Sequence, residues 1–388
     1  MNRIAVFNPE HDMALANGDR HFIAPQNIRE MARDLTPLMN VIDNEGVLVW
    51  GWDHAIKAQL QRMGIDADML PTDTALTALR TCSERKAAHH LLSAFRAVHS
   101  DGPYTGESLI AHNIDNIAAY ATRHEHIILK DPLSSSGKGL RHVNINENED
   151  FLRDALSSSL NKVKNWSNAL VKRHGYLTAE PYYDKVQDFA MEFCIREKQC
   201  HFIGYSLFNT NHHGRYESNL LMEDEKIETL LAQYIPYSAL HDVRNWIISH
   251  NNHIIPGEWN TTKFPLYFGI DMMVVRTTDK VCSEPEAKCN CHSSIPNHQF
   301  ALHPCVEINL RLNMGIIAHE VRRKLLYPGI EGTFHITAFP TEEAARQFSL
   351  EHTEKYPPVY REGKMVSGYH PLTPIHSHTR HHAYIICG

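Results

Sequence analysis

Glu307-Ile308-Asn309-Leu310-Arg311 is the stretch that decides the fold of this chain, and Asn313-Met314-Gly315 follows it. Alternate side chains of a strand share a face, so Val306, Ile308 and Leu310 should point one way and Glu307, Asn309 and Arg311 the other. Polar groups inside such an apolar stretch are costly to bury without partners. Carboxylate and amide oxygens suit Mg²⁺, and an arginine suits a phosphate or a carboxylate. The stretch therefore indicates a site for a metal ion and a phosphorylated nucleotide.

Length and composition limit the number of domains and the class of protein that can carry this site. A chain of 388 residues is too long for one comfortable core, so two or three domains are expected. Apolar residues make up 43% and charged residues 21%, which is ordinary for a globular protein. The net charge of -7, without a basic cluster, argues against a nucleic-acid partner.

The ends and the cysteines indicate the compartment. Residues 1–7 form a short apolar run without the length or cleavage site of a signal peptide. Nowhere does an apolar stretch reach eighteen residues, so no membrane-spanning segment is expected. The eight cysteines follow no regular framework, which favours a reduced, cytoplasmic protein. A homodimer is left open.

The first part of the chain alternates between strand and helix patterns. That alternation favours a small parallel α/β domain over residues 1–82. The expected strands are 3–7, 47–50 and 67–70, and the expected helices are 28–38 and 54–63. A further helix is expected over 83–98, with Ser83 as its cap.

The rest of the chain divides into three more parts, expected at 83–185, 186–331 and 332–388. Expected strands are 127–130, 142–145, 169–172, 188–195, 201–208 and 266–275. Expected helices are 148–166, 223–234, 239–249, 316–325 and 341–352. The polar segment 277–299 is interpreted as an inserted loop, and the last part as a tail with a short strand, a helix and irregular His-rich sequence.

A small-residue loop follows a strand that ends in Lys130. Glycines permit close backbone approach, and hydroxyl and backbone N–H groups can hold phosphate oxygens. Pro132 stands where a Walker A loop needs glycine, so that motif is excluded. A surface turn and a strand-end lysine are the plain alternatives. The candidate phosphate-binding residues are Lys130, Ser134, Ser135, Ser136, Gly137, Lys138 and Gly139.

Three acidic residues stand out further along the chain. Glu180 lies in a connector that can face an adenine edge, and Asp188 can accept hydrogen bonds from ribose hydroxyls. A solvated hairpin is the alternative for this pair. Asp271 stands inside an apolar strand and needs a metal, a cation or several donors. A structural salt bridge is the alternative there.

The order of these pieces resembles the ATP-grasp superfamily over roughly residues 83–325. The most specific element is Glu307-x-Asn309-x-Arg311 with Asp271 upstream, followed by the Lys130 strand and its loop. The resemblance implies an α/β and α+β chain. Its N-terminal Rossmann-like domain would precede a two-lobed ATP-grasp fold, with the ATP cleft between the lobes.

The resemblance also implies roles, carried over residue by residue. Lys130 would bind the α- and β-phosphates, and the loop 134–139 would close on the β- and γ-phosphates. Glu180 would read adenine and Asp188 would hold ribose. Asp271, Glu307 and Asn309 would hold one or two Mg²⁺ (or Mn²⁺) ions, and Arg311 would stabilise the transferred phosphoryl group or the substrate carboxylate.

Three features depart from the family pattern. Lys86 stands where a second phosphate lysine often follows an aspartate, but Arg85 replaces that aspartate. The ribose position more often carries glutamate than the aspartate found at 188. The insert between Asp271 and Glu307 is unusually long.

The implied chemistry is activation of a carboxylate by Mg²⁺-ATP, followed by attack of an amine or a thiol on the acyl phosphate. The partners would be ATP and small-molecule substrates. Two alternatives remain open: a small-molecule kinase with the same fold, and a non-catalytic nucleotide-binding protein. A dehydrogenase is disfavoured because no glycine fingerprint follows the first strand.

The sequence also offers candidates for the second substrate. Asn8, Glu10, His11 and Asp12 follow the first strand, where an α/β sheet places ligands. The second candidate group is Arg215, Tyr216 and Asn219, and turn residues are the alternative for both. The group Cys282, Cys289, Cys291 and His292 is interpreted as a solvated loop. His376 and His378 could share a strand face in the tail, which is expected to pack at the rim of the fold.

Overall fold

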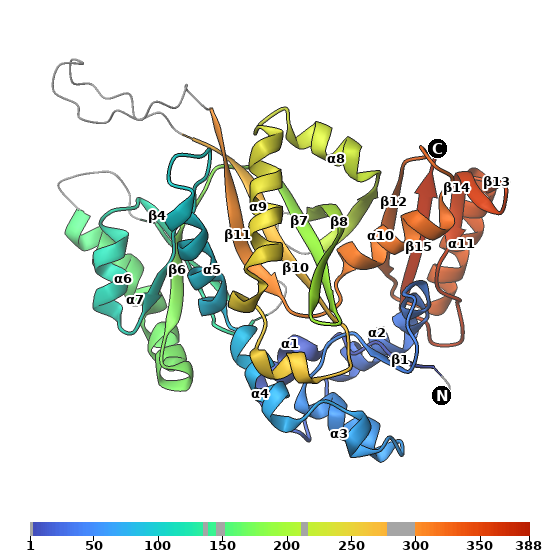
Figure 1. Cartoon of the computed structure of the whole chain (residues 1–388), viewed down its shortest axis with the longest axis horizontal. Helices are drawn as coiled ribbons and strands as arrows, with labels where there is room; N and C mark the ends of the chain where they lie inside the picture. Colours follow the sequence, from blue (N-terminus) through green and yellow to red (C-terminus); the bar gives the residue numbers. More distant parts are fainter. Residues whose placement is uncertain (1–2, 135–138, 145–151, 211–215, 278–298) are drawn as a thin grey trace.

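The structure is a computed structural model that describes residues 3–134, 139–144, 152–210, 216–277 and 299–388. Figure 1 shows an N-terminal segment, a small sheet at one side and a large sheet that runs on to a C-terminal layer at the other. Some sequence predictions fall outside the described residues: Ser135, Ser136, Gly137, Lys138, Arg215, Cys282, Cys289, Cys291 and His292.

The N-terminal segment is built around two parallel strands, β1 (Ile4–Val6) and β2 (Val47–Val49). Its helices are α1 (His11–Asn17), α2 (Gln26–Leu35), α3 (His54–Arg62) and α4 (Asp73–Cys82). The strand expected at 67–70 is wrong, because Ala67–Met69 is a 3₁₀ turn without buried residues. The cap expected at Ser83 is also wrong: Ser83 ends α4, and α5 (Arg85–Val98) begins after Glu84.

The small sheet is antiparallel, with strand order β3-β6-β4-β5. Its strands are β3 (Leu109–Ala111), β4 (His126–Lys130), β5 (Leu140–Asn144) and β6 (Leu177–Pro181). The helices α6 (Ile114–Ala121) and α7 (Leu152–His174) share an apolar core with it. The strand expected at 169–172 is wrong, because this short apolar run is the last turn of α7 and Leu170 packs into the same core.

The large sheet has nine strands in the order β11-β10-β7-β8-β9-β12-β15-β14-β13. Four of them are β7 (Lys185–Arg196), β8 (Gln199–Thr210), β9 (Tyr216–Leu221) and β10 (Leu266–Arg276). The others are β11 (Phe300–Asn309), β12 (Gly332–Ala338), β13 (Val359–Arg361), β14 (Lys364–Pro371) and β15 (His381–Cys387). Because β9 pairs with β12, the last part of the chain shares this sheet with the middle part.

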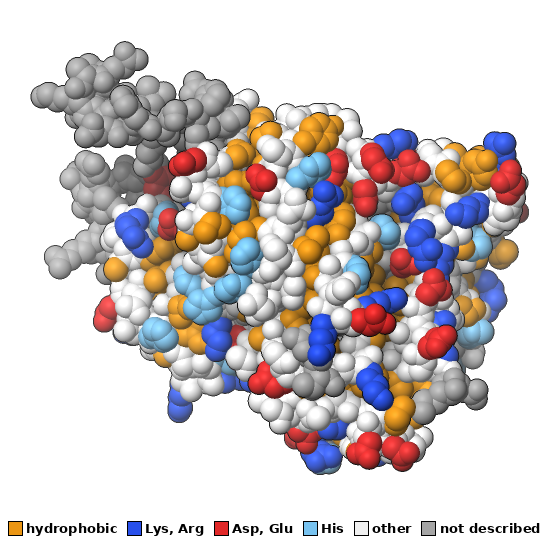
Figure 2. All heavy atoms as spheres, in the orientation of Figure 1, with side chains coloured by type: hydrophobic (Ala, Val, Ile, Leu, Met, Phe, Trp, Pro, Cys, Tyr) orange, Lys and Arg blue, Asp and Glu red, His pale blue; other side chains and the backbone are white. Residues whose placement is uncertain are grey.

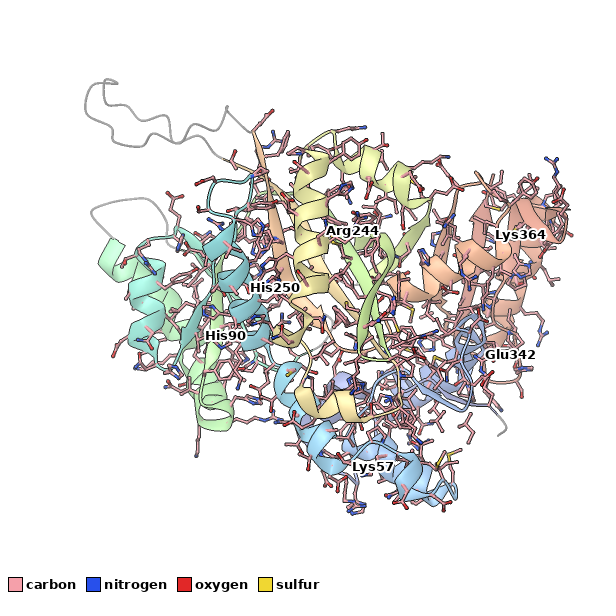
Figure 3. The ribbon with its side chains drawn as sticks, in the orientation of Figure 1. Lys57, His90, Arg244, His250, Glu342 and Lys364 are labelled. Carbon is pink, nitrogen blue, oxygen red and sulfur yellow. The ribbon has the colours of Figure 1, made fainter. Side chains whose placement is uncertain are left out.

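Helices cover both faces of the large sheet. On one face, α5, α8 (Asp224–Leu231) and α9 (Tyr237–Ser249) pack on alternate β7 residues such as Phe189 and Phe193. Arg244 of α9, labelled in Figure 3, lies 5.2 Å from the Phe202 ring centroid and pairs with Glu228. On the other face, α10 (Met314–Leu325) and the N-terminal segment enclose a second core around Cys194.

Strand β11 is irregular where it carries Pro304. Asp271 pairs with Glu307 and Met273 with His303, so residues 304–306 stand opposite Met272 alone. Proline cannot donate a ladder hydrogen bond, which accounts for a bulge at this point. The expected alternation is therefore broken: Val306 packs with Met273 in a small separate cluster, while Ile308 and Leu310 join the large core.

The C-terminal layer is more regular than expected. The His-rich sequence forms β14 and β15, and α11 (Glu342–Lys355) accompanies them. His376 and His378 lie in the turn before β15, so the strand face expected for them is wrong. His382 is fully buried on β15, where Tyr369 and Thr373 contact its two ring nitrogens at 2.7 and 3.1 Å.

Two surface properties complete the description. Within the described residues, no helix is long and apolar enough to cross a membrane. On the face shown in Figure 2, acidic and basic side chains are interspersed rather than gathered by sign.

The buried His382 predicts a pH dependence of stability. Burial lowers its pKa from 6.5 to about 4, so the unfolded chain binds a proton at this position before the folded chain does. The contribution of neutral His382 to stability is complete above pH 6.5 and is lost as the pH falls towards 4. We expect His382→Gln to reduce the drop in melting temperature between pH 7.5 and pH 5, measured by circular dichroism. The exposed His376→Gln is the control, and an unchanged drop in His382→Gln would contradict the assignment.

Candidate active site

One pocket brings together the N-terminal segment, the start of α5 and the end of β11. It also includes the first residues of the loop that follows Lys130, residues 131–139, called the serine-glycine loop below. Its lining from the first two parts is His11, Asp12, Leu15, Ser83, Glu84, Arg85 and Ala88. The other parts contribute Pro132, Leu133, Ser134, Glu307, Ile308, Asn309, Leu310 and Arg311. Two predicted groups of residues therefore meet here, although some 300 residues separate them in sequence.

The predicted metal ligands lie on two neighbouring strands. Asp271 of β10 and Glu307 of β11 are direct cross-strand partners, and the Asn309 amide donates to Asp271 at 3.2 Å. Burial, and then the Glu307 charge, raise the pKa of Asp271 to about 7. No group of three or more His, Cys, Asp or Glu side chains could hold a metal ion within the residues that the structure describes. Two opposed carboxylates and an amide still form an oxygen-rich set that a hard divalent cation would relieve of repulsion.

Arg85, rather than Lys86, faces this carboxylate pair. Its guanidinium is 10% exposed, lies 3.3 Å from Glu307 and donates to the Asp131 carbonyl at 3.1 Å. Lys86 instead pairs with Glu84 at 2.8 Å and does not line the pocket. Lys86, for which the resemblance implied a phosphate role, therefore lies outside the pocket lining, and its neighbour Arg85 lies within it. The doubled basic pair was visible in the sequence, but only the direction of α5 selects Arg85.

Lys130 and Glu180 meet in the small sheet. They stand on the paired strands β4 and β6, and the Lys130 Nζ lies 2.5 Å from a Glu180 oxygen. The sequence predicted separate roles for them, and the structure makes them one buried ion pair. Asp188 lies elsewhere, on β7 opposite Met273, and pairs with Lys185.

The serine-glycine loop is closed at its base. The Asp131 N–H donates to the Gly139 carbonyl at 2.9 Å, so the strand returns directly beneath the loop. A Cβ at Gly139 would lie 2.2 Å from the Ser134 hydroxyl, which explains why glycine is required there. Ser134 lines the pocket.

Arg311 connects the end of β11 to the N-terminal segment. The strand β11 ends at Asn309, and the Arg311 guanidinium forms two 2.9 Å bonds with the Asp12 carboxylate. Burial raises the pKa of Asp12, but Arg311 outweighs it and holds the pKa below its ordinary value. The predicted phosphoryl-stabilising residue and a predicted substrate residue are thus paired with each other.

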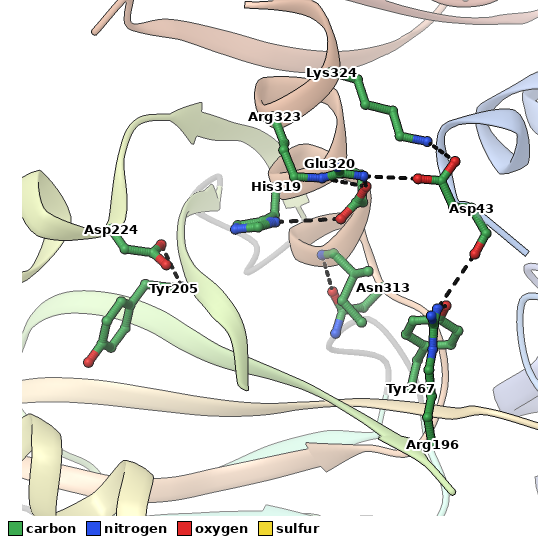
Figure 4. Close-up of polar contacts among 11 residues, drawn as sticks. Asp43, Arg196, Tyr205, Asp224, Tyr267, Asn313, His319, Glu320, Arg323 and Lys324 are labelled. Atoms are coloured by element: carbon green, nitrogen blue, oxygen red, sulfur yellow. Dashed lines mark hydrogen bonds and ion pairs between the residues drawn. The ribbon is translucent and has the colours of Figure 1, made fainter. Parts of the chain in front are cut away.

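The helix after β11 fixes this junction from the other side. Asn313 caps α10 by accepting from the Ile316 N–H at 3.0 Å. At the far end, Arg323 and Lys324 contact Asp43 of the N-terminal segment at 3.0 and 2.6 Å (Figure 4). The end of β11 is consequently held against the N-terminal segment at two points.

The remaining N-terminal candidates differ in what they contact. Asn8 is buried, and its side chain bonds both the N–H and the carbonyl of Gly51. It therefore holds the backbone at Gly51 in place. His11 contacts Asp53 at 3.0 Å and lines the pocket. Burial raises the pKa of Glu10, and its Oε2 is buried without a partner in the described part of the chain.

The two described members of the second candidate group do not reach the pocket. Tyr216 and Asn219 lie on β9, which is enclosed between β8 and β12. Burial raises the pKa of Tyr216 well above its ordinary value, and Asn219 donates to the Ser206 hydroxyl at 2.6 Å. The structure therefore does not bring Tyr216 and Asn219 to this pocket, where the sequence offered them as substrate candidates.

Sequence reasoning missed Glu192. This β7 side chain is 1% exposed, lies beside Gly269 and accepts from the Asn313 amide at 2.6 Å. A Cβ at Gly269 or at Gly315 would lie within 2.4 Å of a Glu192 oxygen, so two glycines make room for it. Its position inside an apolar run, like that of Asp271, was the signal that could have found it.

The comparisons with known proteins match this chain to solved structures at low sequence identity. No protein-family model matches the sequence, and no curated protein does. Biotin carboxylase of Campylobacter jejuni, solved as a β-γ-ATP complex, is similar over all of this chain and 81% of its own, with 12% identity and a TM-score of 0.48. An N5-carboxyaminoimidazole synthetase of Staphylococcus aureus with ADP is 11% identical, with a TM-score of 0.46, over all of this chain and 93% of its own.

A third similar structure is an L-amino acid ligase of Bacillus licheniformis, at 11% identity and a TM-score of 0.43, over all of this chain and 93% of its own. At identities and TM-scores this low, the strand order and the site residues of this chain are the evidence for its fold class. A small antiparallel sheet carries Lys130, and a large sheet carries Asp271 and Glu307. The resemblance in the sequence predicted two lobes, and the structure has a small sheet followed along the chain by a large one.

Glu192 predicts a second pH effect on stability. Burial raises its pKa from 4.5 to about 8, so the folded chain keeps a proton that the unfolded chain has already lost. Its contribution to stability is complete below pH 4.5 and is lost as the pH rises to 8. We expect Glu192→Gln to gain stability relative to the unmodified protein between pH 5 and pH 8, measured by urea unfolding. The exposed Glu225→Gln should show no such trend. If the free energy of unfolding of Glu192→Gln had the same pH dependence as that of the unmodified protein, the raised pKa assigned to Glu192 would be contradicted.

Proposed function

We propose that the protein is an ATP-dependent ligase that activates a carboxylate as an acyl phosphate for attack by an amine. The observation that supports this most is the meeting of two opposed carboxylates and two arginines at the end of β11, beside the pocket. Asp271 and Glu307 face each other across two strands, and Arg85 and Arg311 lie against the same strand end. Such a set suits a reaction in which several negative charges must be held close together.

The acidic set would hold the cation of Mg²⁺-ATP. Asp271, Glu307 and Asn309 would be its ligands, because their oxygens are adjacent and the charge of Glu307 already raises the pKa of Asp271. When bound, Mg²⁺ would neutralise charge on the transferred phosphoryl group. Lys130 and Glu180 would face the nucleotide from the small sheet, and Asp188 remains the proposed ribose ligand.

The arginines would act on the anionic partners of the reaction. Arg85 would turn from Glu307 to the nucleotide phosphates once the cation takes over the carboxylate. Arg311, oriented by its two bonds to Asp12, would face the transferred phosphoryl group or the substrate carboxylate. Ser134 would contact phosphate oxygens from the loop side.

A ligase requires no protein nucleophile, because the acyl phosphate is formed directly on the substrate. A kinase with the same fold would instead leave a stable phosphorylated hydroxyl compound. The compartment, the assembly and the identity of both substrates stay predictions from the sequence.

Trapping with hydroxylamine tests the proposed function. Hydroxylamine converts an acyl phosphate to a hydroxamate, so ATP, Mg²⁺, hydroxylamine and pooled carboxylic acids should give hydroxamate with the unmodified protein. We expect Glu307→Gln to lower this rate by roughly 100-fold or more, as loss of one group stabilising transition-state charge does. Glu225→Gln is the exposed control. Phosphorylation of a hydroxyl compound without hydroxamate would favour the kinase, and an unchanged rate in Glu307→Gln would remove the central assignment.

A matched pair of variants tests the choice between neighbouring basic residues. We expect Arg85→Gln to weaken binding of a fluorescent ATP analogue by roughly tenfold, because one buried charge-assisted contact to phosphate is lost. Lys86→Gln should bind within about twofold of the unmodified protein, since an exposed ion pair contributes little. Equal losses in both variants would contradict the role of Arg85.

A further inference from the structure

A histidine and an aspartate form a buried pair in the wall of the pocket. The His11 Nδ1 lies 3.0 Å from the Asp53 Oδ2, and the two residues are 1% and 3% exposed. His11 lines the same pocket as Arg85 and Glu307. Both residues of the pair belong to the N-terminal segment, whereas the proposed metal ligands belong to β10 and β11.

The surroundings hold the His11 ring in one place. A Cβ at Gly51 would lie 2.4 Å from the ring, so the absence of a side chain at Gly51 is what admits the imidazole. The other oxygen of Asp53 accepts from the Ile56 N–H at 2.8 Å and caps α3. Asn8 adds a 3.4 Å contact to the oxygen that faces the histidine. The carboxylate is therefore fixed by a helix, and the ring is fixed by the carboxylate.

This arrangement selects one ring nitrogen for chemistry. A carboxylate at Nδ1 favours the tautomer with the proton on Nδ1, which leaves Nε2 as a proton acceptor. Within the part of the chain that the structure describes, Nε2 makes no hydrogen bond. A buried imidazole with an oriented base nitrogen at a pocket is the geometry that general-base catalysis requires.

We propose that His11 is the general base that removes a proton from the attacking amine, and that Asp53 is the residue that positions it. This inference rests on the proposed ligase function and names the acceptor as a primary amine that arrives as an ammonium ion. The charged side chains around His11 are Glu10, Asp12 and Asp53. Arg311 neutralises Asp12 in this group, which leaves the Asp53 carboxylate beside His11 to favour a cationic substrate there.

The step balances with the groups named. The ammonium gives one proton to Nε2, and the free amine nitrogen then forms a bond to the acyl carbon. The bond between that carbon and the phosphate oxygen breaks, and its electron pair leaves with inorganic phosphate. The second proton of the amine nitrogen goes to the departing phosphate as the amide forms, and His11 returns its proton to solvent.

Two nucleophiles separate this role from the proposed function. Hydroxylamine is largely unprotonated at neutral pH and needs no base, whereas the amino acids of a pooled amine set are ammonium ions. We expect His11→Gln to keep hydroxamate formation within about twofold and to lose roughly 100-fold in amide formation at pH 7, the size of a general-base contribution. The amide rate of this variant should recover as the pH rises and free amine accumulates. Asp53→Asn, which keeps an oxygen for the α3 cap, should show the same pattern more weakly.

The matched control is His54→Gln, because His54 follows Asp53 but contacts Thr77 away from the pocket. Equal losses of hydroxamate and amide in His11→Gln, or equal retention of both, would overturn the assignment of His11. Hydroxamate without any amide from the pool, using the unmodified protein, would overturn the amine acceptor. Failure to form hydroxamate with the unmodified protein would instead overturn the proposed function on which the assignment rests.

Discussion

Two opposed acidic side chains, Asp271 and Glu307, impose the constraint on which the rest of this structure depends. Neighbouring strands place them face to face, and burial together with mutual repulsion raises the pKa of Asp271 to about 7. Such a pair is tolerated only where positive charge is close. The chain supplies it from two directions, with Arg85 against Glu307 and Arg311 at the strand end. The need to balance these negative charges therefore explains why α5, the end of β11 and the start of the serine-glycine loop converge at the pocket.

The same charges hold the parts of the molecule together. Arg311 contacts Asp12 in the N-terminal segment, and Arg85 bonds the backbone of the serine-glycine loop at Asp131. A cation or a phosphate that enters the pocket would compete for these contacts. Ligand binding is therefore coupled to the contacts that join the N-terminal segment, α5 and the end of β11. The His11–Asp53 pair differs, because its partners all lie within the N-terminal segment. That independence suits a group whose task is proton transfer rather than charge balance.

Much of the site could be predicted from short stretches, and the failures have identifiable causes. Lys130, Asp271 and Glu307 were found because a charged residue inside an apolar strand is visible in sequence. Glu192 carries the same signal and was passed over. Lys86 was a candidate through the family resemblance alone, and sequence position cannot tell which of two adjacent side chains faces the pocket. Tyr216 and Asn219 were misjudged because the sequence does not say that β9 becomes an interior strand.

The sequence by itself determined the order of the elements and the chemistry available, because hydrophobic periodicity and residue type are local properties. The tertiary structure decided which of these groups meet. It paired Arg311 with Asp12 across 299 residues, joined Lys130 to Glu180 and extended the large sheet into the C-terminal layer through β9 and β12. It also placed a bulge at Pro304 that local alternation did not predict. Contacts between distant segments depend on packing and charge compensation in three dimensions, and no window of sequence contains that information.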